Sequence, residues 1–286
     1  MKSEWKAPKN GFFGWYFKCQ SETDTIVFIA SVTTGVEKAT ANLQIAGRDG
    51  TWNVEFPVES FTLKGGNIFI ENNHFGKNGI VVDVSDDKVK VKGKLYFRDF
   101  TPLEYDIMGP FVMVPFMECR HSVMSMKHVV NGAITINGRK YEFEDAFGYW
   151  EGDRGVSFPS KYLWTQTAFE DGSLMLSIAE IPMGNKSFTG VIGIISLKGK
   201  EYRFATYRGA KIRYLKNRRV YISQGNMTLE AKLYNQEGQT FAAPENAEMS
   251  RVIHENLKST AAYRFCIEGE TVFAFKTDQA SFEYEY

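Results

Sequence analysis

The sequence has little cysteine, no excess of charge of either sign and no long hydrophobic run. Its three cysteines, Cys19, Cys119 and Cys266, are odd in number and widely spaced, so we expect free thiols in a reducing cytoplasm rather than a disulfide framework. No CxxC pair suggests a zinc site. The longest clearly apolar run, Val191–Leu197, falls far short of the ~18 residues that indicate a membrane-spanning helix. No apolar segment follows the charged start of the sequence, which therefore predicts no secretory signal.

The balance of charge excludes further classes of protein. The 34 basic residues equal the 34 acidic ones, and the isoelectric point is near 6.9. This balance gives no general attraction to nucleic acid or to an anionic membrane. We therefore expect no nucleic-acid partner and no transmembrane segment, while peripheral contact with a membrane and the oligomeric state stay open.

Aromatic residues, by contrast, are abundant. The chain of 286 residues contains 23 Phe, 14 Tyr and 5 Trp, which make up 15% of it. At this length a chain can bury a core without disulfides or metals, in one large domain or two ordinary ones. The aromatic excess therefore has room to form a core or to line a ligand pocket.

Short β-rich runs alternate with turn signals along the whole sequence. Asn-Gly and Asp-Gly pairs, which supply the positive φ angles of tight turns, begin at Asn10, Asp49, Asn78, Asn131, Asn137 and Asp171. Val89–Phe97 alternates between apolar residues and lysines as a half-buried strand does, and Gly93 is the expected site of a bulge or bend in it. Other expected strands are 25–32, 79–84, 133–136, 174–178 and 191–197. This pattern predicts an all-β fold of the sandwich or barrel type.

Two features of the organisation stay open. Ala247–Leu257 fits both helical spacing and strand alternation. An internal repeat is suggested by matches at similar sequence offsets, for which duplication and chance are about equally good explanations. These matches are Trp15 with Trp164, Ala30 with Ala179, and Lys94-Leu-Tyr96 with Lys232-Leu-Tyr234. If the chain is duplicated, we expect two closely packed β units, residues 1–118 and 119–286.

The first candidate site segment is the aromatic run Phe12-Phe-Gly-Trp-Tyr-Phe17. A strand that seeds an aromatic core explains it most simply. It also suits the wall of an apolar pocket, because aromatic faces stabilise a nearby positive charge. Trp15 and Tyr16 are therefore candidate substrate-binding residues.

The second segment, Gly148 to Gln166, interleaves aromatic, acidic and basic residues. In an extended chain Glu151 and Asp153 project from one face. Repulsion and burial can keep one carboxyl protonated as a general acid, while Arg154 can hold the other ionised. An exposed, turn-stabilising ion network fits the same residues. The face shared by Tyr162, Trp164 and Gln166 suits a pocket wall with a polar contact, although a core glutamine is equally plausible.

The third segment, Met117 to His128, carries two of the four histidines. His121 or His128 can act as an acid or donate a hydrogen bond. Strict strand alternation puts the two on opposite faces unless a bulge intervenes. Metal binding by Glu118, Cys119 and His121 is the weaker hypothesis, because this alternation separates the two histidines. The sequence has no nucleophile elbow, phosphate-binding loop or dinucleotide fingerprint.

These segments resemble the tocopherol cyclase family, in particular its bacterial branch. Phe12-Phe-Gly-Trp-Tyr-Phe-Lys18 is similar to that family's F-F-E-G-W-Y-F-K signature, and Gly148–Gln166 resembles its second signature, roughly G-Y-x-E-x-D-W-G-x-x-F-P-x-x-W-x-W-x-Q. Two further stretches look similar, Pro115-Phe-Met-Glu-Cys-Arg-His121 with Ser125-Met-Lys-His128, and Met249-x-Arg251-x-Ile253-x-Glu255. The matches are ordered and cover most of the chain.

The resemblance implies a fold of two tandem lipocalin-like β units and a prenylated quinol or similar hydrophobic small molecule as substrate. Cyclases of this kind protonate an alkene, and a phenol oxygen closes the ring, with no redox cofactor or metal. Glu151 or Asp153 would be the acid, His121 or His128 its orienting partner. The pocket walls would be Trp15, Tyr16, Phe158 and Trp164.

Departures from the signatures support a different reading. Phe13 leads directly to Gly14 without the family's acidic residue, and Arg154 and Tyr162 each stand where the second signature has tryptophan. An arginine beside the pocket would oppose a carbocation and suit a polar headgroup. Because a shared fold does not establish a shared function, a non-catalytic carrier of a hydrophobic molecule is the alternative to an enzyme. A β protein whose cavity is filled by side chains is the third.

Overall fold

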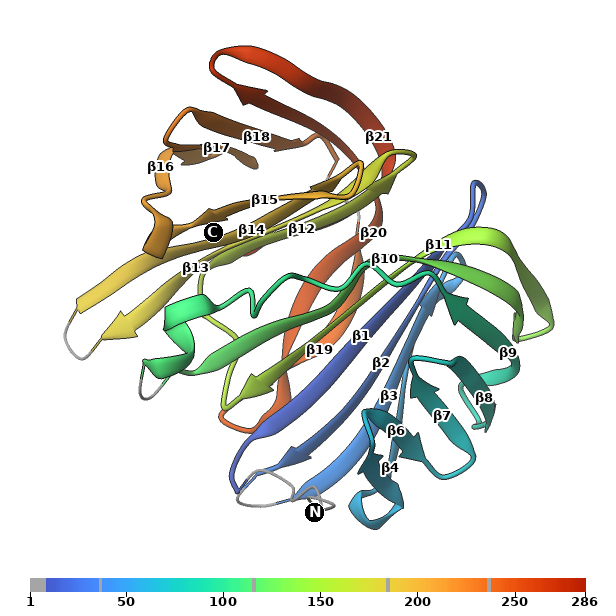
Figure 1. Cartoon of the computed structure of the whole chain (residues 1–286). Helices are drawn as coiled ribbons and strands as arrows, with labels where there is room; N and C mark the ends of the chain where they lie inside the picture. Colours follow the sequence, from blue (N-terminus) through green and yellow to red (C-terminus); the bar gives the residue numbers. More distant parts are fainter. Residues whose placement is uncertain (1–8, 36–37, 115–116, 184–185, 236–237) are drawn as a thin grey trace. The chain divides into compact units, whose positions relative to one another are not determined.

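The computed structural model describes residues 9–35, 38–114, 117–183, 186–235 and 238–286. Residues 115–116, which begin one of the quoted motifs, lie outside the described part. Within it the regular structure consists of strands and three short 3-10 helices, so the prediction of an all-β fold is confirmed (Figure 1). The helices are η1 Val58–Ser60, η2 Gly109–Met113 and η3 Thr206–Arg208.

Eleven strands form one curled antiparallel sheet in the order β4-β3-β2-β1-β11-β10-β9-β8-β7-β6-β5 (Figure 1). Their bounds are β1 Phe12–Gln20, β2 Thr25–Thr34, β3 Ala39–Gly47, β4 Gly50–Pro57, β5 Phe61–Lys64, β6 Asn67–Ile70, β7 Asn73–Gly76, β8 Gly79–Ser85, β9 Lys90–Arg98, β10 Cys119–Ile136 and β11 Arg139–Gly155.

The second sheet has the order β15-β14-β13-β12-β21-β20-β18-β17-β16, and β19 pairs with β20 beside this path. Its strands are β12 Tyr162–Phe169, β13 Gly172–Met183, β14 Lys186–Leu197, β15 Lys200–Ala205, β16 Lys211–Lys216, β17 Arg219–Gln224, β18 Met227–Leu233, β19 Gln239–Glu245, β20 Glu248–Ile267 and β21 Glu270–Tyr284. The segment that fitted both periodicities, Ala247–Leu257, is therefore strand.

The chain divides into two compact units that exchange segments. Unit 1 comprises residues 1–103, 119–158 and 241–252, and unit 2 comprises residues 104–118, 159–240 and 253–286. This grouping differs from the expected division at residue 118, because β10 and β11 pair with β9 and β1. Pairing between strands, rather than order along the chain, decides which unit a segment joins.

The two sheets repeat one arrangement of strands. In the first sheet, the four-strand meander β1–β4 lies next to the long hairpin β10–β11. In the second sheet, the meander β12–β15 lies next to the long hairpin β20–β21 in the same way. Trp15 and Trp164 lie on the corresponding strands β1 and β12, but Trp15 packs against the core of unit 1 whereas Trp164 points away from the core of unit 2, so the two positions are not equivalent. The alanine match is not equivalent, because Trp15 is opposite Ala30 whereas Trp164 is opposite Ser177.

Each unit has its own hydrophobic core on one face of its strands. The core of unit 1 includes Phe17 and Trp150, and that of unit 2 includes Leu163 and Phe282. Since successive residues of a strand point to opposite faces, the neighbours of these residues face away from the cores. The candidate site lies on such a face of unit 1.

Of the bulge or bend expected at Gly93, the bulge is absent. The register of β9 with β8 and β10 runs through Gly93 without a shift. Its φ of 155° and the closeness of the next strand explain the glycine, because a Cβ would lie 2.3 Å from the carbonyl oxygen of Ala133.

Candidate active site

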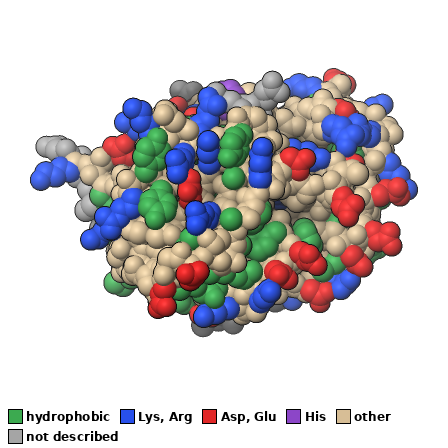
Figure 2. Space-filling model, turned by 90° about the horizontal axis from the view of Figure 1, so that it is seen from above, with side chains coloured by type: hydrophobic (Ala, Val, Ile, Leu, Met, Phe, Trp, Pro, Cys, Tyr) green, Lys and Arg blue, Asp and Glu red, His purple; other side chains and the backbone are tan. Residues whose placement is uncertain are grey.

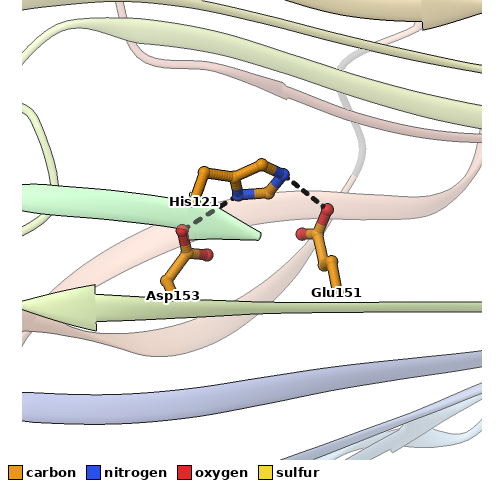
Figure 3. A group of neighbouring side chains, drawn as sticks. All are labelled: His121, Glu151 and Asp153. Atoms are coloured by element: carbon orange, nitrogen blue, oxygen red, sulfur yellow. Dashed lines mark hydrogen bonds and ion pairs between the residues drawn. The ribbon is translucent and has the colours of Figure 1, made fainter. Parts of the chain in front are cut away.

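The hairpin β10–β11 brings three titratable side chains together in unit 1: His121, Glu151 and Asp153 (Figure 3). His121 is directly opposite Asp153 across the two strands. Glu151 precedes Asp153 by two residues, so both carboxylates project from the same face of β11. The core residue Trp150 points to the other face. The expectation that Glu151 and Asp153 share a face is therefore met, with an imidazole between them.

The imidazole of His121 contacts one carboxylate at each nitrogen. Its Nδ1 lies 2.9 Å from Oδ1 of Asp153, and its Nε2 lies 3.2 Å from Oε2 of Glu151 (Figure 3). The side chains are shielded from solvent, with exposed fractions of 11% for His121, 7% for Glu151 and 19% for Asp153. Cys119 adds a thiol donor 3.5 Å from Oδ1 of Asp153.

These contacts fix the charge of His121. Burial alone favours the neutral ring, but the nearby Glu151 and Asp153 carboxylates outweigh it and raise the pKa of His121 well above 6.5. The ring is therefore an imidazolium at neutral pH, whose Nδ1–H donates a hydrogen bond to Asp153 and whose Nε2 forms an ion pair with Glu151. The cluster therefore holds a proton on His121, between two carboxylates that can act as bases.

Tyr149 extends the cluster along β11. Its hydroxyl donates to Oε2 of Glu151, the same oxygen that faces His121. Burial, followed by the charge of Glu151, raises the pKa of Tyr149 well above 10, so the phenol keeps its proton. The ring of Tyr16 lies edge-on to Tyr149, with 6.4 Å between ring centroids. An aromatic wall thus adjoins the acid–base groups.

The cluster also has residue types that bind metal ions, since ligand atoms of His121, Glu151 and Asp153 lie within 4.8 Å of one another. A metal would need lone pairs that converge on one point. Here Asp153 contacts Nδ1 of the ring and Glu151 contacts Nε2, so the two carboxylates approach different ring nitrogens rather than one common point. The arrangement therefore suits proton transfer better than metal ligation.

His128, the other histidine proposed from the sequence, lies in a different environment. Its ring packs 4.5 Å from that of Phe97 and 4.8 Å from that of Phe100, next to the core of unit 1. Neither ring nitrogen has a hydrogen-bond partner in the described residues. Burial lowers the pKa of His128 to about 3, so the ring is neutral. Shifts in register between Val123 and His128 separate the two histidines.

The remaining candidates of unit 1 divide between the two faces of its sheet. Tyr16 is on the face of the cluster, whereas Trp15 points to the opposite face and stacks on Phe61 at 6.0 Å. Arg154 is exposed and, as the neighbour of Asp153 in the strand, projects from the other face. Phe158 packs edge-on against Phe12 at 5.6 Å.

Trp164 and Gln166 belong to unit 2, on the face of β12 that points away from its core. Trp164 is opposite Glu283 of β21, and Glu283 is in turn opposite Glu255 of β20. All four side chains are buried. The hydroxyl of Tyr162 donates to Glu283. Unit 2 thus has a buried acidic group of its own.

The sequence analysis did not single out Tyr149, which belongs to the cluster of unit 1. It also did not single out Glu255 and Glu283, which form the buried acidic group of unit 2. A signal existed for Tyr149, because strand alternation places it on the face of Glu151 and Asp153. Glu255 closes one of the quoted family motifs. Glu283 has no such signal, because its neighbours are set by the pairing of β21 with β12 and β20.

The fold and the cluster define an all-β protein with two large curled sheets and a buried acid–base group on one of them. The model of the tocopherol cyclase-like family matches residues 103–280, more than half of the sequence, and the chain belongs to this family. The resemblance noted from the motifs is thereby confirmed. No curated protein sequence matches the chain significantly.

Solved structures with the same fold have low sequence identity to the chain. The structure of CghA has a TM-score of 0.62 at 11% identity and covers 100% of this chain and 93% of its own. CghA with Sch210972 gives 0.60 at 10%, with coverage of 96% and 88%. Kievitone hydratase from Nectria haematococca gives 0.57 at 10%, with coverage of 99% and 91%. At such identities the likeness shows the fold alone.

Among the described residues, no helix has both the length and the apolar character needed to cross a membrane.

Proposed function

We propose that this protein is an enzyme that cyclises or isomerises a prenylated quinol, or a similar apolar substrate, by acid–base catalysis. The observation that carries the proposal is the buried imidazole of His121 held between the carboxylates of Glu151 and Asp153. Membership of the tocopherol cyclase-like family supports the reaction class. So do the neighbours in fold, since kievitone hydratase is named as a hydratase and CghA is seen with a small molecule, Sch210972.

The cluster contains both an acid and a base, as the addition of a hydroxyl group across an alkene requires. The imidazolium gives its proton to one alkene carbon, which forms a C–H bond. The hydroxyl oxygen of the substrate bonds to the other carbon, and its proton passes to a carboxylate. The new carboxyl group then returns this proton to the neutral imidazole, which restores the starting state of the cluster without an oxidant or reductant.

The raised pKa of His121 favours a concerted reaction. It keeps the acid protonated at neutral pH but also makes it a weaker acid, which gives less driving force for forming a free carbocation. If a carboxylate removes the hydroxyl proton while the alkene is protonated, neither a free cation nor a free phenolate accumulates. The faces of Tyr16 and Tyr149 can stabilise the positive charge that remains.

The position of Arg154 removes one objection to this chemistry. A guanidinium beside the reacting carbon would oppose a developing cation. Because Arg154 is exposed and projects from the opposite face to Asp153, its charge is directed to solvent. A different observation favours the alternative of a non-catalytic carrier. The side chains of the cluster already bind one another, His121 to Asp153 and Tyr149 to Glu151, as they would in a purely structural network.

The test is turnover of a prenylated hydroquinone in D₂O, followed by chromatography and mass spectrometry. We expect a cyclised product with one deuterium on carbon, because the proton delivered by His121 exchanges with solvent. Asp153→Asn and Glu151→Gln should each reduce turnover by about 10²–10⁴-fold while the substrate still binds. Asp145→Asn is the matched control, since this carboxylate lies on the same strand but is exposed and paired with Arg98.

Normal turnover in both cluster variants would contradict the acid–base role. Recovery of an unchanged hydrophobic molecule from the purified protein, together with no product from the hydroquinone, would favour the carrier.

A further inference from the structure

Unit 2 has a row of cations on the face of its sheet that points away from its core. Reading across five strands, Lys216 is opposite Arg219, Arg219 is opposite Lys232, Lys232 is opposite Ala262, and Ala262 is opposite Lys276. Directly opposite residues of antiparallel strands share a face. The four basic side chains, here called the cationic row, therefore form one line across the sheet. Lys232 is half-buried, and the other three are exposed.

Tyrosines flank the cationic row. The ammonium groups of Lys232 and Lys276 lie 4.6 and 4.7 Å from the centre of the Tyr234 ring, and the guanidinium of Arg219 lies 5.7 Å from that of Tyr214. Tyr234 is 49% exposed and Tyr214 is 41% exposed. Figure 2 shows Lys and Arg side chains interleaved with hydrophobic ones over part of one face of the molecule.

The cationic row is unfavourable for folding by itself. Like charges directly opposite in a sheet destabilise it. Glu230 pairs with Arg219 at 2.6 Å, but no acidic side chain among the described residues forms an ion pair with Lys216, Lys232 or Lys276. Protection of a sheet edge explains Lys216 on β16, the end strand, and Lys276, which lies outside the part of β21 that pairs with β12. It does not explain Lys232, because β18 is paired on both sides at this residue. An anionic partner would supply the missing counter-charge.

We propose that the cationic row docks unit 2 onto the anionic phospholipid headgroups of a membrane surface. Five strands give a surface roughly 20 Å wide, which spans several headgroups. Lysine and tyrosine each combine an apolar body with a polar tip, as suits the layer between water and lipid tails. Binding of single-stranded nucleic acid fits less well, because ammonium groups cover the ring of Tyr234 on which a base would stack. The proposal stands on this geometry and does not rest on the reaction proposed above.

The experiment is co-sedimentation of the full chain with vesicles of phosphatidylcholine, with and without phosphatidylglycerol, at low and high salt. We expect binding to the anionic vesicles at low salt, loss of binding at high salt, and none to the neutral vesicles. Each cation near an anionic surface contributes about fivefold to affinity, so the double variant Lys232→Gln/Lys276→Gln should bind about 25-fold more weakly.

The matched control is the double variant Lys90→Gln/Lys94→Gln. It removes the same charge from β9 of unit 1, where Lys94 also lies over a tyrosine, Tyr96, but has the uncharged Ala133 and Val81 opposite it. Its vesicle binding should match that of the unmodified protein. Equal loss in both double variants, equal binding to neutral and anionic vesicles, or no vesicle binding at low salt would each overturn the proposal. Binding to single-stranded RNA without vesicle binding would overturn it in favour of a nucleic-acid partner.

Discussion

Two histidines on β10 show how strongly surroundings decide the chemistry of a residue. His121 and His128 are seven residues apart on one strand, yet one is an imidazolium between carboxylates and the other a neutral ring between phenylalanines. Both are buried, so desolvation acts against the charge in both. Only His121 has anions near enough to reverse this effect. The two residues therefore give opposite dependences of stability on pH.

For His128, we expect stability to fall as the pH falls. Its pKa is about 3 in the fold and near 6.5 in the unfolded chain, so the unfolded state takes up a proton between these values. The stabilisation is complete above pH ~6.5 and decreases by about 1.4 kcal/mol per pH unit below it. Urea denaturation between neutral pH and about pH 4.5 should show a correspondingly shallower dependence for His128→Leu. Identical slopes in the two proteins would contradict a neutral, buried His128.

For His121 the sign is reversed. Its pKa is raised in the fold, so its stabilisation is complete below pH ~6.5 and is lost as the pH rises through the raised value. His121→Gln leaves Glu151 and Asp153 without their cation and should lower the free energy of unfolding by about 3–5 kcal/mol near pH 6. This deficit should shrink at alkaline pH, where the unmodified protein also loses the charge. Measurement of both proteins by denaturant titration tests this, and a deficit that grows with pH would be inconsistent with a charged His121.

At the scale of the element, β11 separates chemistry from packing by simple alternation. Tyr149, Glu151 and Asp153 project from one face, and Gly148 and Trp150 from the other, towards the core. Gly148 is opposite His128, where the absence of a side chain makes room for the imidazole. The same strand thus supports the cluster and holds the neutral histidine in place.

Gly148→Ala tests that packing. The added Cβ would lie 2.2 Å from Nε2 of His128, whose ring is confined by Phe97 and Phe100. We expect a loss of about 1–3 kcal/mol in the free energy of unfolding. Gly14→Ala is the control, because its Cβ would find its nearest neighbour, the Cβ of Ser31, at 3.7 Å. Thermal or urea denaturation of the two variants should separate them, and equal stability would show that the site can relax.

At the scale of the whole molecule, each unit is completed by segments distant in sequence. Unit 1 includes residues 241–252, which follow most of unit 2 along the chain. The side chain of Gln44 on β3 both donates to the carbonyl oxygen of Ala242 and accepts from its N–H, each at 2.8 Å. Gln44 is buried, so the two backbone groups depend on it for their partners. A single side chain thus joins segments far apart in the chain.

Gln44→Leu should therefore be costly although it exchanges one buried side chain for an apolar one of similar size. Both backbone groups of Ala242 would lose this partner, and we expect a loss of about 2–4 kcal/mol in the free energy of unfolding. Asn53→Ala, which changes the exposed residue opposite Gln44 on β4, should alter it by less than about 0.5 kcal/mol. Denaturant titration compares the two, and similar small effects would mean that the backbone of Ala242 finds other partners.

The sequence by itself determined the local features of this protein. Turn pairs and alternation predicted an all-β chain, and alternation alone placed Glu151 and Asp153 on one face, because side-chain direction in a strand depends only on position along it. The motifs also indicated the family. Pairing between distant strands decided the rest: which histidine joins the carboxylates, where Glu283 lies, and that β10 and β11 belong to unit 1. Net charge is a sum over the chain, so its value of zero could not reveal that Lys216, Arg219, Lys232 and Lys276 form one row. Only the register of the folded sheet sets them side by side.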